Sequence, residues 1–226
     1  MDGALLLALG EVDCERIGGG WLAQPVNALS SLAYVAAGGW LLARARRSGD
    51  RAFLAAAGAA VAAVGFGSIA YHGPQPAWAG WAHDGPILAF PLVLAARSAW
   101  TLRRRDLRFA TAYAAGGVAV LGVVGGLGRP GTALGLPAAA AVAVAGTFLV
   151  LPVPAAARLW SRPALLMAAA LAAYVLGRTG SPLCRPGGPW QLHGAWHVLS
   201  AAALGSAAAR FTGRSRAEPD RVVSRD

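Results

Sequence analysis

All four histidines of the chain lie within or beside long apolar segments, in two short clusters. The first cluster holds His72 and His83, with Ser68 four residues before His72, and the second holds His193 and His197. Residues i and i+4 share one face of an α-helix, so Ser68 pairs with His72, and His193 pairs with His197. Such groups are costly to bury in hydrocarbon without partners, so we expect them to face one another or a metal ion.

An acidic residue, Asp84, follows His83 directly at the start of an apolar segment. Three imidazoles and a carboxylate suit zinc, and catalytic zinc sites leave a fourth position for water. We therefore predict that His72, His193 and His197 bind zinc, with Asp84 beside them. A histidine taken alone has another interpretation, as a polar residue that packs membrane helices together.

The composition indicates an all-α membrane protein. Of the 226 residues, 56% are hydrophobic and only 13% are charged, and the mean hydropathy is +0.51. Soluble domains carry about a quarter charged residues, and a membrane-spanning helix needs about 20 apolar residues. We expect a seven-transmembrane helix bundle. Its spans are expected at residues 26–43, 52–71, 85–102, 109–127, 132–153, 164–176 and 190–209.

The arginines predict the orientation of this bundle. All twenty basic residues are arginine, and positive charge marks the cytoplasmic side of short loops. Fifteen arginines follow the odd-numbered spans, so the N-terminus is expected outside and the C-terminus in the cytoplasm. They are Arg44, Arg46, Arg47, Arg51, Arg103, Arg104, Arg105, Arg108, Arg158, Arg162, Arg210, Arg214, Arg216, Arg221 and Arg225.

This topology brings the candidate ligands to one level of the membrane. The second span ends beside His72, the third begins after Asp84, and the seventh begins with His193 and His197. All four lie at the extracytoplasmic end, although the arginines alone set the orientation. The lack of lysine indicates a GC-rich genome and hence a bacterial plasma membrane. Nucleic-acid binding, another interpretation of the net charge of +10, fits poorly because the arginines are dispersed among short loops.

Both cysteines fall on the extracytoplasmic side of this topology, Cys14 before the first span and Cys184 before the seventh. An oxidising compartment permits a disulfide, so we expect the two to pair; two unpaired thiols are the alternative. The polar and charged residues 213–226 are expected to form a disordered cytoplasmic tail. The membrane domain is then expected to cover residues 1–212.

The order of these motifs resembles the alkaline ceramidases, a family of the CREST superfamily of seven-transmembrane metal hydrolases. The matching residues run through nearly the whole chain: Cys14, Glu15, Asn27, Ser31, Ser68 to His72, Asp84, Cys184, and Gln191 to His197. The resemblance implies zinc-dependent cleavage of the amide of ceramide, or of a similar membrane lipid, into a sphingoid base and a fatty acid. A lipid substrate would enter laterally between the helices.

The chemistry of zinc and the resemblance together imply roles for the polar residues. Zinc lowers the pKa of bound water, which can then attack a carbonyl. Asp84 would take the proton and deliver it to the leaving amine, and Ser68 would orient a ligand or donate to the developing oxyanion.

The family's acidic N-terminal stretch, implied in calcium binding, is matched only in part. Asp13 and Glu15 are present, but Arg16 and a triple glycine follow, and Gln24 stands near the place of a family glutamate. The resemblance thus implies zinc, and calcium only through Asp13 and Glu15.

Two other classes of function compete with the hydrolase. A seven-transmembrane receptor with a structural zinc site would be favoured by four protein ligands, with His83 or Asp84 bound to the metal. A transporter would place its site near the midplane on broken helices and often shows internal repeats, and the sequence has neither feature.

Overall fold

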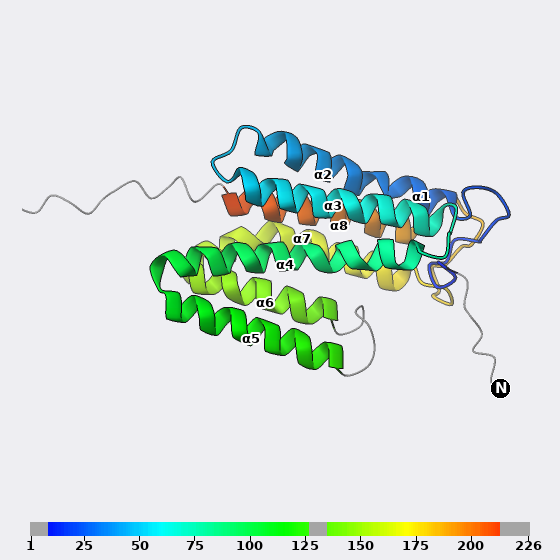
Figure 1. The fold of residues 1–226 in the computed structure, drawn as a ribbon. Coiled ribbons are helices and arrows are strands. Elements are labelled where there is room, and N and C mark those ends of the chain that lie inside the picture. The colour runs from blue at the N-terminus through cyan, green and yellow to red at the C-terminus, as the bar shows by residue number, and fades with distance from the viewer. Residues whose placement is uncertain (1–8, 127–134, 213–226) are drawn as a thin grey trace, which may run out of the picture.

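The computed structural model describes residues 9–126 and 135–212, and the regular structure of these residues is entirely helical. The helices are α1 (Pro25–Ser30), α2 (Leu32–Ala45), α3 (Arg51–His72), α4 (Ala79–Arg105), α5 (Leu107–Gly126), α6 (Gly135–Val150), α7 (Val153–Leu176) and α8 (Leu192–Thr212). They lie roughly along one direction and run up and down the bundle, with α1 and α2 forming one interrupted rod (Figure 1). A helix therefore covers at least part of every expected span. The expected tail 213–226 and the boundary between the fourth and fifth spans lie outside the described residues.

Four helical stretches among the described residues, the first made of α1 and α2 together, are long and apolar enough to cross a membrane. They are Pro25–Ala45, Arg51–His72, Ala79–Arg104 and Val153–Leu176. This agrees with a membrane protein, because a span of about 20 apolar residues crosses the hydrocarbon core.

The sixth expected span, 164–176, is too short, because α7 begins at Val153 and continues through Pro163. A proline inside a helix cannot donate to the carbonyl four residues before it, here that of Leu159. The guanidinium of Arg210 on α8 lies at this point, where its Nη1 donates to the Arg158 carbonyl at 2.7 Å and lies 3.4 Å from that of Leu159. A partner distant in sequence thus supports the helix where the sequence suggested a loop.

The packing of α2 on α3 depends on facing glycines. A Cβ atom at Gly38 would lie 2.6 Å from the Gly58 carbonyl, and one at Gly58 would lie 2.9 Å from the Gly38 carbonyl. Close approach of this kind is typical of membrane helices. The neighbouring core is formed by buried side chains of α2, α3 and α8, among them Leu41, Leu54, Val61, Ala208 and Phe211.

The N-terminal segment, residues 9–24, lies across one end of the bundle and is tied to the loop between α7 and α8. Cys14 and Cys184 form the expected disulfide, with their Cα atoms 5.5 Å apart. The Arg16 N–H donates to the Pro186 carbonyl at 2.9 Å, and the Cys14 N–H donates to Thr179 Oγ1 at 3.0 Å. The segment is therefore part of the folded bundle.

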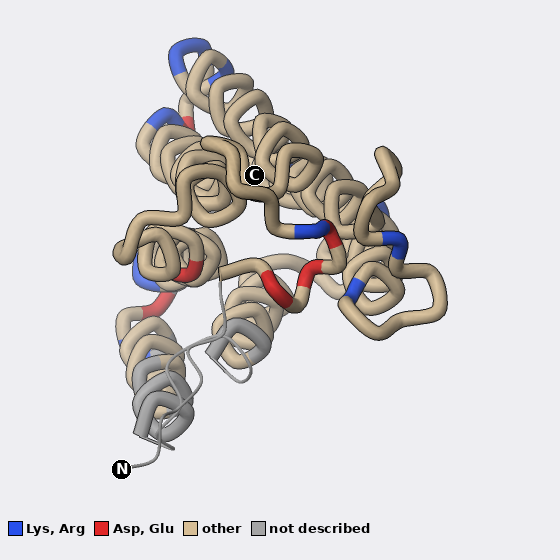
Figure 2. Tube along the Cα trace, turned by 90° about the vertical axis from the view of Figure 1, so that its right-hand side faces the viewer, with Lys and Arg blue, Asp and Glu red and all other residues tan. Residues whose placement is uncertain are grey.

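The two ends of the bundle differ in composition. The end covered by the N-terminal segment holds His72, His193 and His197 and is called the histidine end. The opposite end, called the arginine end, contains the chain around Arg44 and Arg103 (Figure 1). Seen along the bundle from the histidine end, acidic and basic positions lie close together over the helix ends (Figure 2). Which end faces the cytoplasm stays a prediction.

Candidate metal centre

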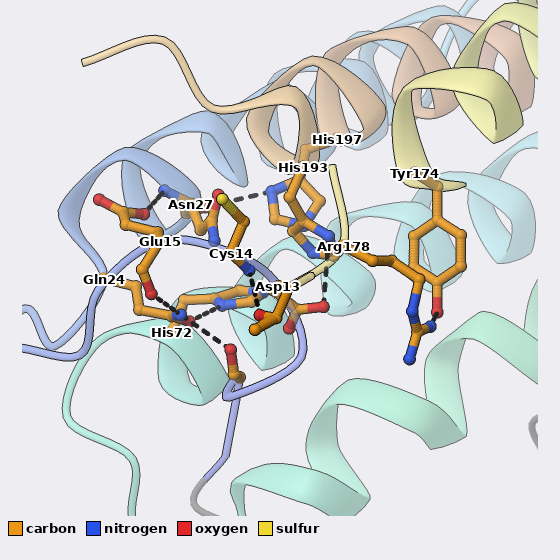
Figure 3. A network of polar contacts seen from close by, with 12 residues as sticks. Asp13, Cys14, Glu15, Gln24, Asn27, His72, Tyr174, Arg178, His193 and His197 are labelled. Carbon is orange, nitrogen blue, oxygen red and sulfur yellow. Dashed lines mark hydrogen bonds and ion pairs between the residues drawn. The ribbon is translucent and has the colours of Figure 1, made fainter. Parts of the chain in front are cut away.

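The three predicted ligands converge at the histidine end. His72 is the last residue of α3, and His193 and His197 lie on the first two turns of α8. One nitrogen from each of the three rings lies within 4.8 Å of the other two. Their residues are almost completely buried, at 0%, 4% and 1% exposure respectively. The i,i+4 spacing places His193 beside His197 on α8, and the packing of α3 against α8 brings His72 to them (Figure 3).

The tautomer of His72 follows from its partner, Gln24. The Gln24 Nε2 donates to the carbonyls of Gly10 at 2.9 Å and Glu15 at 2.7 Å, so its Oε1 faces His72. That oxygen can only accept, and it lies 2.7 Å from His72 Nδ1, which must therefore carry a proton. The lone pair of His72 is left on Nε2.

His197 has the same arrangement with a different partner. Its Nδ1 lies 3.1 Å from the Asn27 carbonyl, which can only accept, so Nδ1 is again protonated. The hydroxyls of Ser30 and Ser31 lie 2.9 Å and 3.2 Å from the same nitrogen. The lone pair of His197 is thus also left on Nε2.

Ser68 is connected to His197 indirectly. Its residue is 1% exposed, and its Oγ accepts a hydrogen bond from Ser31 Oγ at 3.0 Å. Because Ser31 also contacts His197 Nδ1, Ser68 is connected to that histidine through a second hydroxyl. This position suits the orientation of a ligand, the first of the two roles expected for Ser68.

The third histidine lies against a carboxylate of the N-terminal segment. Asp13 Oδ1 lies 3.4 Å from His193 Nδ1, and both side chains are buried. Burial raises the pKa of the Asp13 carboxyl to about 6, against the opposing influence of the His83 and Arg178 charges. A carboxylate in this position favours a bound cation.

Asp84 is more exposed than the three histidines. Its Oδ1 accepts a hydrogen bond from His83 Nδ1 at 2.8 Å, and its side chain is half exposed. The His83 ring stacks on Tyr71 and has its centroid 6.2 Å from that of His72. His83 thus contacts Asp84 and lies near His72, and the catalytic role of Asp84 stays a prediction.

The residues associated with calcium are used in other contacts. Glu15 Oε1 and Oε2 accept the N–H groups of Val26 and Asn27, each at 2.8 Å, and so satisfy free donors in the first turn of α1. Asp13 faces His193, and Gln24 faces His72. Within residues 9–126 and 135–212, the three histidines form the one group of three or more potential ligands close enough to share an ion.

The donor atoms fit a metal ion. Three ring nitrogens, His72 Nε2, His193 Nδ1 and His197 Nε2, are buried without a hydrogen-bond partner in the described part of the chain. Buried polar atoms almost always have partners, and unpaired ones need a physical reason. A metal ion supplies that reason, and imidazole nitrogens suit zinc.

Sequence analysis named Gln24, Asn27 and Ser31 but assigned them no role in holding the histidines. Gln24, Asn27 and Ser31 recur at helical spacing near the start of the first apolar segment, and all three are completely buried. Polar residues on one face of an apolar helix are the signal that could have identified them. Their partners lie far away in the sequence, so their roles required the fold.

The chain was compared with protein-family models, curated proteins and solved structures, and none of these comparisons found a match. A function must therefore be argued from the site.

Proposed function

We propose that this chain is a seven-transmembrane, zinc-dependent hydrolase that cleaves the amide bond of ceramide or a similar lipid. The observation that carries the proposal is the convergence of His72, His193 and His197, each with a buried ring nitrogen that has no hydrogen-bond partner among the described residues. The apolar helices support a membrane location. The order of motifs shared with the alkaline ceramidases supplies the substrate class.

The site has the ligand number of a catalytic zinc centre. Zinc held by the three histidines would supply a Lewis acid that activates water and polarises the amide carbonyl. Gln24 and Asn27 accept the Nδ1 protons of His72 and His197 and thereby direct both Nε2 lone pairs into the cluster. Among the described residues, no carboxylate or cysteine joins this group as a fourth ligand.

The two carboxylates nearest the cluster suit different tasks. Asp13 is buried against His193, where its negative charge would favour a bound cation. Asp84 is half exposed and is bonded to His83. We assign proton transfer to Asp84, because the proton must pass from water to a leaving amine that then departs.

A receptor with a structural metal site is the second candidate. The near-complete burial of the three histidines favours it, as does the N-terminal segment fixed across the site by the Cys14–Cys184 disulfide. A structural site excludes substrate and a catalytic site must admit it, so activity separates the two candidates.

Purified protein in detergent or liposomes tests the hydrolase proposal. The measurement is release of fatty acid from a panel of N-acylated sphingoid bases and simpler lipid amides, with metal content determined on the same sample. We expect about one zinc per chain and amide hydrolysis that a chelator removes and zinc restores. If fully zinc-loaded protein hydrolyses no lipid amide or ester at any pH, the hydrolase proposal is rejected in favour of the receptor.

A further inference from the structure

Gln24 holds His72 at two points. It is the completely buried residue that precedes Pro25, at the junction of the N-terminal segment with α1. Its main-chain N–H donates to the His72 carbonyl at 2.8 Å, and its side-chain Oε1 accepts the His72 Nδ1 proton at 2.7 Å. One residue thus fixes both the end of α3 and the direction of the imidazole (Figure 3).

The other half of the Gln24 amide holds the N-terminal segment. Its Nε2 donates to the carbonyls of Gly10 and Glu15, which lie on either side of Cys14. Gly10 has a φ of +76°, and a Cβ atom there would collide with Gln24 Oε1. The segment is therefore shaped around this amide, which accepts from a histidine and donates to two carbonyls.

We propose that Gln24 is a positioning residue of the metal centre, which couples the N-terminal segment to metal binding through His72. This inference rests on the proposed function in one respect only, that the three histidines bind a metal. The physical basis is the tautomer: with Nδ1 protonated toward Gln24, the lone pair of His72 is on Nε2, the buried nitrogen without a hydrogen-bond partner. Partners of a ligating histidine typically account for about 10- to 100-fold in metal affinity.

Two substitutions of Gln24 distinguish its contact with His72 from its contacts with the N-terminal segment. Gln24→Leu removes both functions of the amide, whereas Gln24→Glu keeps an acceptor for His72 Nδ1 and loses the donors to Gly10 and Glu15. Gln191 is a matched control. It is buried, its Nε2 donates to the carbonyls of Arg185 and Gly188, and none of its hydrogen bonds among the described residues reaches a histidine side chain.

The experiment measures metal binding by the full chain in detergent. Zinc affinity is determined by competition with a chromophoric chelator, and cobalt loaded in place of zinc reports ligand geometry through its visible absorption spectrum. We expect Gln24→Leu to weaken zinc binding by about 10- to 100-fold and to change the cobalt spectrum. Gln191→Leu should remain close to wild type in both readouts. Gln24→Glu should bind zinc more tightly than Gln24→Leu but less tightly than wild type, because it keeps the acceptor for His72 and loses the donors to the segment.

Equal zinc affinity in Gln24→Leu and Gln191→Leu would overturn the proposal, as would a Gln24→Glu variant as weak as Gln24→Leu. If Gln24→Leu does not fold, Gln24→Asn replaces it, because the shorter amide cannot reach all three partners; wild-type affinity in that variant overturns the proposal. A wild-type protein that binds no metal would overturn both this inference and the proposed function. Wild-type protein that binds zinc but hydrolyses nothing would contradict the hydrolase alone, and the Gln24 comparison would still be decisive.

Discussion

The histidine end and the arginine end treat polar side chains in opposite ways. At the histidine end, Gln24, Asn27, Ser68 and the three metal-binding candidates are buried. The side chains of Gln24, Ser68, His72 and His197 make specific hydrogen bonds, whereas the Asn27 amide makes none among the described residues. At the arginine end, Arg44, Arg46 and Arg47 are exposed and line a hollow of about 570 Å³ with Trp40 and Ser48. The same bundle thus buries polar groups at one end and leaves charges in contact with solvent at the other.

This difference shows which end of the bundle is less stable than an apolar core would be. Burying a polar group is unfavourable unless its partners are supplied, and a partly satisfied network is less stable than an apolar core. The arginine end avoids that cost, and its charges suit the water-facing side of a membrane. The histidine end carries that cost, and one nitrogen in each of its three imidazole rings is buried without a hydrogen bond among the described residues. This is the physical argument for a bound ion.

The largest difference between the two ends is expected from paired substitutions. The double change His193→Ala and His197→Ala removes two of three ligands, so both zinc and lipid amide hydrolysis should be lost completely. Arg46→Ala with Arg47→Ala, at the opposite end, should retain both. Elemental analysis and fatty-acid release on the same preparations check this. Equal zinc content in the two double variants would show that the metal does not bind at the histidine end.

Within the histidine end, substitutions of Asp84 and Asp13 should have different effects. Asp84→Asn keeps the shape and loses the basicity, so hydrolysis should fall by about 100-fold or more while zinc content stays nearly intact. Asp13→Asn removes a buried negative charge beside His193 and should weaken zinc affinity by about 10-fold or more. Steady-state rates and chelator competition distinguish the two effects.

Loss of zinc in Asp84→Asn would instead show that Asp84 is a metal ligand and that the site has four protein ligands.

The disulfide should matter for retention of the metal as well as for stability. Cys14→Ser with Cys184→Ser releases the N-terminal segment that carries Asp13 and contacts Gln24. We expect a loss of about 2–5 kcal/mol in stability and faster transfer of zinc to a chelator. Thermal unfolding and zinc-release kinetics measure the two quantities. Unchanged zinc release in a destabilised variant would show that the segment acts on the fold alone.

Ser68 should give the smallest effect on zinc. Among the described residues, Ser68 is connected to His197 through Ser31, so Ser68→Ala should weaken zinc binding by less than the roughly 10-fold expected for a direct partner. The loss in hydrolysis should be about 10-fold if Ser68 only orients the ligand. A loss near 1,000-fold with normal zinc affinity would instead assign the serine to the oxyanion.

The sequence predicted features that depend on local spacing. The i,i+4 relation placed His193 beside His197, and the apolar segments located the helices that carry them. The position of His72 at the same end of the bundle as His193 and His197 followed from counting spans. These inferences needed no knowledge of which helices pack together.

Features that depend on contacts distant in sequence were missed or wrong. The contact between Asp13 and His193 was missed, because Asp13 reaches that ring only after the N-terminal segment folds over the bundle. The role expected of Asp84 stays a prediction. The start of α7 was wrong because the contacts of Arg210 near Pro163 come from another helix. The role of Gln24 is visible only when residues 10, 15 and 72 lie together.

The most direct test of the central claim is zinc K-edge X-ray absorption on purified wild-type protein. An open centre on His72, His193 and His197 predicts three imidazole nitrogens at about 2.0–2.1 Å and one oxygen that does not come from the protein. That oxygen should be displaced by an added zinc-binding inhibitor. Protein without zinc, or zinc with four protein ligands that no inhibitor perturbs, would contradict the account.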